Sequence, residues 1–174
     1  MVNGRAVERY SLWLMPAGGV REWLVRTLRE LSVQYGAPEF PPHVTLLGGI
    51  TEARGEVLRR TASLAALLRP FIVQLGEIDC LDQYFRSLFA RAAPTRPLLK
   101  AHQLACQVFG HRREPLFMPH LSLLYGDFSQ SLKDKTIAAM GQRLDLQFKV
   151  QNLFLYSTRG EPSRWRQVAR LGLK

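Results

Sequence analysis

Two short stretches of the chain carry the same kinds of residue in the same order. The first motif is His43–Leu46, with the sequence HVTL, and the second motif is His120–Leu123, with the sequence HLSL. In a β-strand, residues two positions apart point to the same face, so each motif presents an imidazole and a hydroxyl together. Its apolar residues point to the other side, where they can be buried. Two such strands facing each other would line a pocket with two histidines and two hydroxyls.

This set of groups suits the opening of a cyclic phosphodiester. The reaction needs a base that activates water and an acid that protonates the leaving oxygen, and histidine can do either near neutral pH. The hydroxyls of Thr45 and Ser122 can donate hydrogen bonds to the phosphoryl oxygens, where negative charge sits in the transition state. We expect His120 to be the base and His43 the acid, although the symmetry of the motifs leaves the reverse assignment open. Because no carboxylate cluster accompanies the motifs, we expect no metal and no cofactor.

The remaining histidines and the cysteines have no comparable context. His102 and His111 are expected to be exposed residues of a helix or a loop. Cys80 and Cys106 form no C-x-x-C pair, and two thiols at this spacing do not supply the ligands of a zinc site. We expect both cysteines to be reduced.

The pattern of apolar residues and of glycine and proline predicts a mixture of strands and helices without strict alternation, which indicates an α+β fold. The expected strands are 8–15, 43–47, 71–75, 84–91, 120–125, 146–156 and 165–171, and the expected helices are 20–35, 58–68, 94–108 and 132–143. Each motif follows a helix and a proline, and a helix comes after each. This repetition suggests two pseudo-equivalent lobes that face one cleft. No linker separates them, so residues 1–174 are expected to form a single two-lobed domain.

The bulk composition sets the broad class. A chain of 174 residues, with 47% hydrophobic and 22% charged residues, is typical of one globular domain. The sequence predicts no membrane-spanning segment and no signal peptide, so we expect a cytoplasmic protein and a monomer. The formal net charge of +10 favours anionic partners such as nucleic acid, nucleotides or phosphorylated sugars. The basic residues are scattered, which leaves open whether they form a polyanion track or a solvated surface.

At this point the motifs resemble the duplicated H-x-[ST]-x signature of the two-histidine (2H) phosphoesterase superfamily. Within it, the chain is similar to the cyclic phosphodiesterase branch described in plants and yeast. The resemblance extends over nearly the whole chain. It includes YSLW at 10–13, PHVTL at 42–46, the aromatic pair at 84–85 and MPHLSLLY at 118–125.

The resemblance implies a fold in which two antiparallel sheets line a central cleft and helices pack outside. It also implies an enzyme that hydrolyses ADP-ribose 1″,2″-cyclic phosphate to ADP-ribose 1″-phosphate. Nucleoside 2′,3′-cyclic phosphates would be opened to 2′-phosphates in the same way. The catalytic residues carried over from the family are His43, Thr45, His120 and Ser122.

The resemblance further implies that Trp13 and Tyr125 are cleft aromatics that contact the substrate. Strict alternation places Tyr125 on the opposite face from Ser122, so it can line the cleft only if the strand ends or bulges before it. A core tyrosine is the alternative. Trp13 shares a strand face with Ser11, and this position fits either the cleft or a buried tryptophan.

Two other functions remain open. The first is the 2′-5′ RNA ligase and RNA-end-processing branch of the same superfamily, which the net charge of +10 keeps in consideration. The second is a non-catalytic module that binds cyclic-phosphate or RNA ends. The hydroxyl beside each histidine argues against the module, because binding alone needs no paired acid and base.

Overall fold

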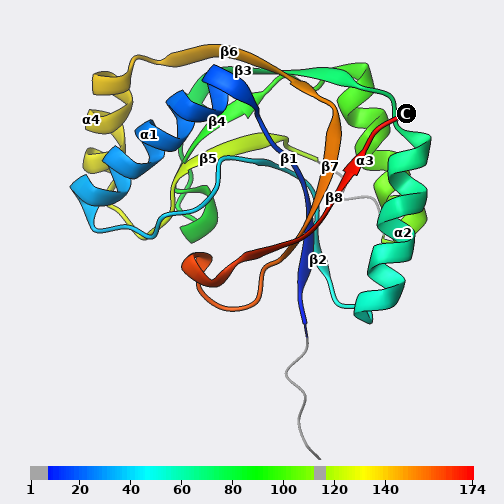
Figure 1. Cartoon of the computed structure of the whole chain (residues 1–174). Coiled ribbons are helices and arrows are strands. Elements are labelled where there is room, and N and C mark those ends of the chain that lie inside the picture. Colours follow the sequence, from blue (N-terminus) through cyan, green and yellow to red (C-terminus); the bar gives the residue numbers. More distant parts are fainter. Residues whose placement is uncertain (1–7, 112–116) are drawn as a thin grey trace, which may run out of the picture.

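The computed structural model describes residues 8–111 and 117–174. The described residues form eight strands and four α-helices, which confirms the expected α+β class (Figure 1). In chain order the elements are β1 (Tyr10–Leu14), α1 (Gly18–Tyr35), β2 (Val44–Ile50), α2 (Arg54–Leu67), β3 (Phe71–Asp79), β4 (Leu88–Ala92), α3 (Arg96–Phe109), β5 (His120–Leu124), α4 (Gln130–Met140), β6 (Arg143–Val150), β7 (Asn152–Ser157) and β8 (Arg166–Gly172).

The strands form one curled antiparallel sheet in the order β6-β3-β4-β5-β2-β1-β7-β8. The two antiparallel sheets expected from the sequence are the halves of this sheet. The second-motif half is β6-β3-β4-β5 and the first-motif half is β2-β1-β7-β8. They meet where β2 pairs with β5, and the register of that junction consists of Val44 opposite Leu121. The two motif strands are therefore neighbours at the centre of the sheet.

The helices lie outside the curl, where the apolar sides of the strands are covered (Figure 1). Helix α1 contacts β5 and β6, whereas α2 contacts β7 and β8 and α3 contacts β2. In α1 the buried residues Leu24, Leu28 and Leu31 recur at helical spacing, and the helix ends at Gly36, whose φ of 63° suits glycine. None of the helices in the described ranges is both long enough and apolar enough to cross a membrane.

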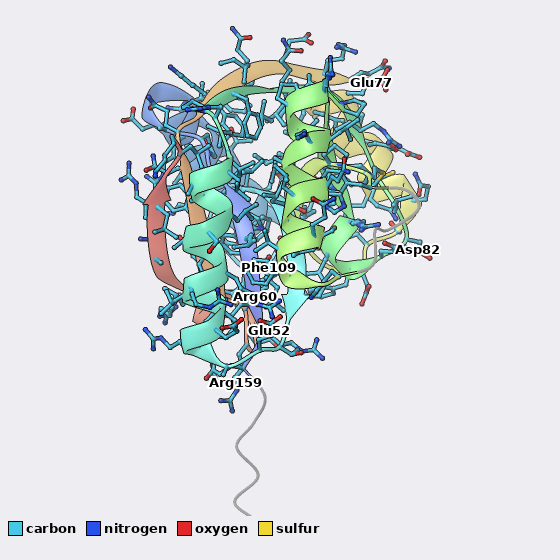
Figure 2. All side chains as sticks on the ribbon, turned by 90° about the vertical axis from the view of Figure 1, so that its right-hand side faces the viewer. Glu52, Arg60, Glu77, Asp82, Phe109 and Arg159 are labelled. Atoms are coloured by element: carbon cyan, nitrogen blue, oxygen red, sulfur yellow. The ribbon has the colours of Figure 1, made fainter. Side chains whose placement is uncertain are left out.

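Helices α2 and α3 lie side by side on the outer face, as Figure 2 shows, and Arg60 links them. Its guanidinium lies 3.3 Å from the carboxylate of Glu52, just before α2, and donates to the carbonyl oxygen of Val108 in α3 at 3.0 Å. These two helices cover β2, β7 and β8 from outside. They therefore support the strand that carries the first motif.

The structure corrects two of the expected strands. The expected strand 146–156 is divided at Gln151 into β6, which pairs with β3, and β7, which pairs with β1 in the other half of the sheet. The buried residues change parity there, from Phe148 and Val150 to Leu153 and Leu155, so one straight strand could not bury both pairs on one face.

The expected strand 84–91 begins instead with a 3₁₀ turn, Tyr84–Arg86, before β4 starts at Leu88. This turn lies beside β5. It therefore brings Phe85 and Arg86 to the second motif.

Candidate functional site

All six site residues expected from the sequence line one cavity of about 530 Å³. They come from β1 (Trp13), from β2 and the residue before it (Thr45, His43), and from β5 and the residue after it (His120, Ser122, Tyr125). The cavity therefore joins both halves of the sheet. A larger cavity of about 850 Å³ lies along β3, β4 and β6, and neither motif histidine lines it.

The two histidines are held in the same way. The Nδ1 atom of His43 lies 2.6 Å from the carbonyl oxygen of Pro41, and the Nδ1 atom of His120 lies 2.8 Å from that of Met118. Because a carbonyl oxygen can only accept, each Nδ1 carries a hydrogen and donates it. In the neutral ring, Nε2 then holds the lone pair and is the atom available for proton transfer. The proline before each histidine favours the extended backbone of this approach.

Burial shifts both histidines towards their neutral forms. The pKa of His43 is lowered to about 4, chiefly by desolvation and to a lesser extent by the nearby charge of His120, against the hydrogen bond to Pro41, which raises it. The pKa of His120 is also lowered, first by burial and then by the positive charges of Arg86 and Arg91, against the hydrogen bond to Met118. At neutral pH the free protein therefore holds His43 as a neutral imidazole.

Trp13 packs directly against the histidine of the first motif. Its indole is stacked on the His43 ring with centroids 3.6 Å apart, and Tyr156 covers its other face at 3.9 Å. The indole Nε1 donates to Ser11 Oγ at 2.8 Å, and only 1% of the residue is exposed. Because both faces are covered, a substrate can reach only the edge of this ring. The geometry thus ties Trp13 to the orientation of His43.

The hydroxyl groups are placed beside the histidines. Thr45 is half-buried, and among the described residues no protein group forms a hydrogen bond with its hydroxyl. Ser122 Oγ donates to the carbonyl oxygen of Phe85 at 3.1 Å. A ligand that accepts from Ser122 must replace this bond.

Tyr125 lines the cavity because β5 ends at Leu124, just before it. This is the strand end that the sequence analysis required for a cleft position. The residue is nevertheless 3% exposed, and its ring is stacked on Phe40 at 3.7 Å. Burial raises the pKa of the Tyr125 phenol, and a hydrogen bond with Ser122 offsets part of that rise. Tyr125 is thus both a core residue and part of the cavity wall.

Several lining residues were missed by the sequence analysis. Phe85 and Arg86 arrive on the 3₁₀ turn, and Arg159 and Trp165 arrive on the connection between β7 and β8. Trp165 lies with its ring centroid 5.7 Å from that of Trp13. The aromatic pair at 84–85 was a usable signal, but nothing in the strand pattern marks the β7–β8 connection.

His102 was expected to be exposed, and this expectation is wrong. The residue is 6% exposed in α3, where Nδ1 donates to the carbonyl oxygen of Leu46 at 2.8 Å and Nε2 lies 3.5 Å from Cys106 Sγ. Its helical spacing placed it on the same side as the buried Leu98 and Ala105, which is the signal that was overlooked. Across residues 8–111 and 117–174, no cluster of three or more His, Cys, Asp or Glu side chains is arranged to hold a metal ion.

Comparison with known proteins points to one family. The sequence model of the family described as "Cyclic phosphodiesterase-like protein" matches residues 9–172. The chain is 23% identical over 167 residues to the protein named cyclic phosphodiesterase from Arabidopsis thaliana, with 92% of each chain covered.

Two solved structures share the fold. TT0787 of Thermus thermophilus is similar with a TM-score of 0.65 and 19% identity, over 95% of this chain and 97% of that one. LigT of Escherichia coli in its apo form has a TM-score of 0.64 and 18% identity, over 97% of this chain and 98% of that one. LigT has also been solved in complex with 3′-AMP and with NADP+.

Proposed function

This chain belongs to the cyclic phosphodiesterase-like protein family of the two-histidine phosphoesterase superfamily, and we propose that it hydrolyses nucleotide-derived cyclic phosphodiesters without a metal. One observation carries the proposal. His43 and His120 line one cavity, and each holds its Nδ1 hydrogen on a carbonyl oxygen, which leaves both Nε2 atoms for proton transfer.

The deeper burial of His43 favours a division of roles, because it holds that ring in its neutral form. His43, whose pKa is lowered to about 4, is neutral at physiological pH and takes the proton of the attacking water on Nε2. His120 is the acid: the negative phosphate of a bound substrate favours its protonated ring, which gives the Nε2 proton to the leaving oxygen. The water oxygen forms a new bond to phosphorus, the ring P–O bond breaks, and a phosphomonoester with a free hydroxyl results. This assignment reverses the one that we preferred from the sequence.

The remaining groups that line the cavity bind the phosphate and the base of the substrate. The hydroxyls of Thr45 and Ser122 donate to the non-bridging oxygens, where they stabilise the charge of the transition state. The guanidinium groups of Arg86 and Arg159 add positive charge to the cavity wall. The Phe85 ring is 52% exposed at the same wall and offers an apolar surface to a base.

The substrates that we propose are nucleoside 2′,3′-cyclic phosphates, opened to 2′-phosphates, and ADP-ribose 1″,2″-cyclic phosphate. The complexes of the structural neighbour LigT with 3′-AMP and NADP+ support a nucleotide-shaped ligand. The test is turnover of both substrate types in the presence of EDTA by the wild type, His43→Gln and His120→Gln. We expect each variant to lose most activity, whereas His111→Gln, outside the cavity, should keep it. Normal hydrolysis by either cavity variant would refute the proposal.

A cyclic phosphate of nitrocatechol separates the two roles, because nitrophenolate leaves without needing a proton. We expect His120→Gln to recover much of its loss on this substrate, since only the acid becomes dispensable. His43→Gln should remain inactive on it. Recovery by His43→Gln instead would restore the order preferred from the sequence.

The RNA-end-processing branch is the second candidate function. Arg9, Arg86 and Arg159 line the cavity, and the formal net charge of the chain is +10, so an oligonucleotide end would be attracted. The two candidate functions are distinguished by comparing turnover of an oligonucleotide that ends in a 2′,3′-cyclic phosphate with turnover of the corresponding mononucleotide. A kcat/KM much higher for the oligonucleotide and falling steeply with salt would favour this branch.

A further inference from the structure

Both motifs are preceded by a phenylalanine three residues before the histidine. The sequences are FPPH at 40–43 and FMPH at 117–120. The carbonyl oxygen that accepts from each histidine belongs to the residue directly after that phenylalanine. Anything that fixes the phenylalanine therefore also fixes the hydrogen-bond acceptor of the histidine.

Each phenylalanine is stacked on another ring. Phe40 is stacked on Tyr125, with centroids 3.7 Å apart and an interplanar angle of 19°. Phe117 is stacked on the buried His102, at 3.7 Å and 2°. Stacked pairs of this kind stabilise the structure beyond what burial of the rings alone contributes.

The two stacks cross the junction between the halves of the sheet. Tyr125 directly follows β5, so the Phe40 stack ties the approach of the first motif to the strand of the second. His102 donates to the carbonyl oxygen of Leu46 in β2, so the Phe117 stack ties the approach of the second motif to the strand of the first. The β2–β5 ladder itself holds only the Val44 and Leu121 pair in register. Backbone pairing between these two strands therefore does little to fix the two histidines relative to each other.

We infer that Phe40 with Tyr125, and Phe117 with His102, are two positioning pairs that fix the Nε2 atoms of the catalytic histidines across this junction. The inference rests on the proposed function for its effect on catalysis, but its structural part stands apart from turnover. Loss of the Phe40 stack frees the carbonyl oxygen of Pro41, and His43 loses its preference for the Nδ1–H form. Loss of the Phe117 stack frees the carbonyl oxygen of Met118 and has the same effect on His120.

The test uses nitrogen-15 NMR of the histidine rings above pH 7, which reports the tautomer of each neutral imidazole. In the wild type we expect His43 and His120 to be Nδ1–H. Phe117→Leu should convert His120 to a mixture with the Nε2–H form and leave His43 unchanged. Phe40→Leu should convert His43 in the same way and leave His120 unchanged. Phe148→Leu, which removes a buried ring from β6 outside both pairs, is the control and should change neither.

Kinetics provide the second readout. We expect kcat of Phe117→Leu to fall about tenfold to a hundredfold with KM little changed, because misplacement of a reacting group acts on the transition state. Phe117→Tyr keeps the ring and should restore both kcat and the tautomer, which guards against a variant that merely folds poorly. In a His102→Leu background, the further change Phe117→Leu should add little, since the pair acts as one unit.

Unchanged tautomers in both phenylalanine variants would overturn the inference, and so would the same change in Phe148→Leu. A wild type that hydrolyses no cyclic phosphate would refute the proposed function instead. The tautomer pattern would still decide whether the positioning pairs exist.

Discussion

The burial of His43 should make the stability of the protein depend on pH in a way that one substitution removes. The folded state lowers the pKa of this imidazole from 6.5 to about 4. The folded protein therefore binds fewer protons than the unfolded chain, so acid favours unfolding. The contribution of the neutral His43 ring to the free energy of unfolding is fully present above pH 6.5 and is lost as the pH falls towards 4. At about 1.36 kcal/mol for each pKa unit, the limiting loss of unfolding free energy is about 3 kcal/mol.

Replacing His43 with asparagine removes the titrating group and should remove this loss. At pH 5 the wild type should have lost about 2 kcal/mol relative to pH 7 through His43 alone. The assay is urea unfolding of the wild type and His43→Asn at both pH values, with the free energy of unfolding extrapolated to water. Because His120 titrates in both proteins, the difference between their pH dependences isolates His43.

The control is His111→Asn, two residues after α3 and outside the cavity, which should keep the pH dependence of the wild type. Equal pH dependence in His43→Asn and the wild type would refute the reasoning. In that case the imidazole would not be desolvated in the folded protein, and the assignment of His43 as the base would lose its support.

Three further changes test other parts of the site. Arg91→Gln should raise the pKa of His120 in an NMR titration, because the guanidinium charge is one cause of its lowering; an unchanged pKa would contradict this. Gly126→Ala should lower stability by about 2–3 kcal/mol in thermal melts, since φ is 142° and the added Cβ would lie 2.5 Å from the Phe128 ring. EDTA should leave hydrolysis of a cyclic mononucleotide unchanged, and loss of activity on chelation would contradict the metal-free mechanism.

The placement of the motif side chains could be predicted from the sequence because it depends on residue type and strand parity. His43 and Thr45, like His120 and Ser122, share a face through the two-residue period of extended chain, and they line one cavity in the structure. The helices could also be predicted, since apolar spacing such as that of Leu24, Leu28 and Leu31 depends only on local sequence.

Contacts between distant segments could not be predicted in this way. The indole of Trp13 covers His43 because β1 pairs with β2, and Trp165 reaches the same cavity from a connection that has no strand pattern of its own. The division of the 146–156 segment was visible only as a change of parity. That β6 and β7 join opposite halves of the sheet depends on which strands were left to pair.

The sequence by itself determined which groups face the cavity, because strand parity is a local property of the chain. The tertiary structure decided how strongly each histidine is desolvated, and the roles that we propose follow from that. The pKa of His43 depends on how much water the packed sheet excludes, and its ring is fixed by Pro41 and Trp13. The histidines of two similar motifs thus differ in burial and in charged neighbours, because folding surrounds each of them with different residues.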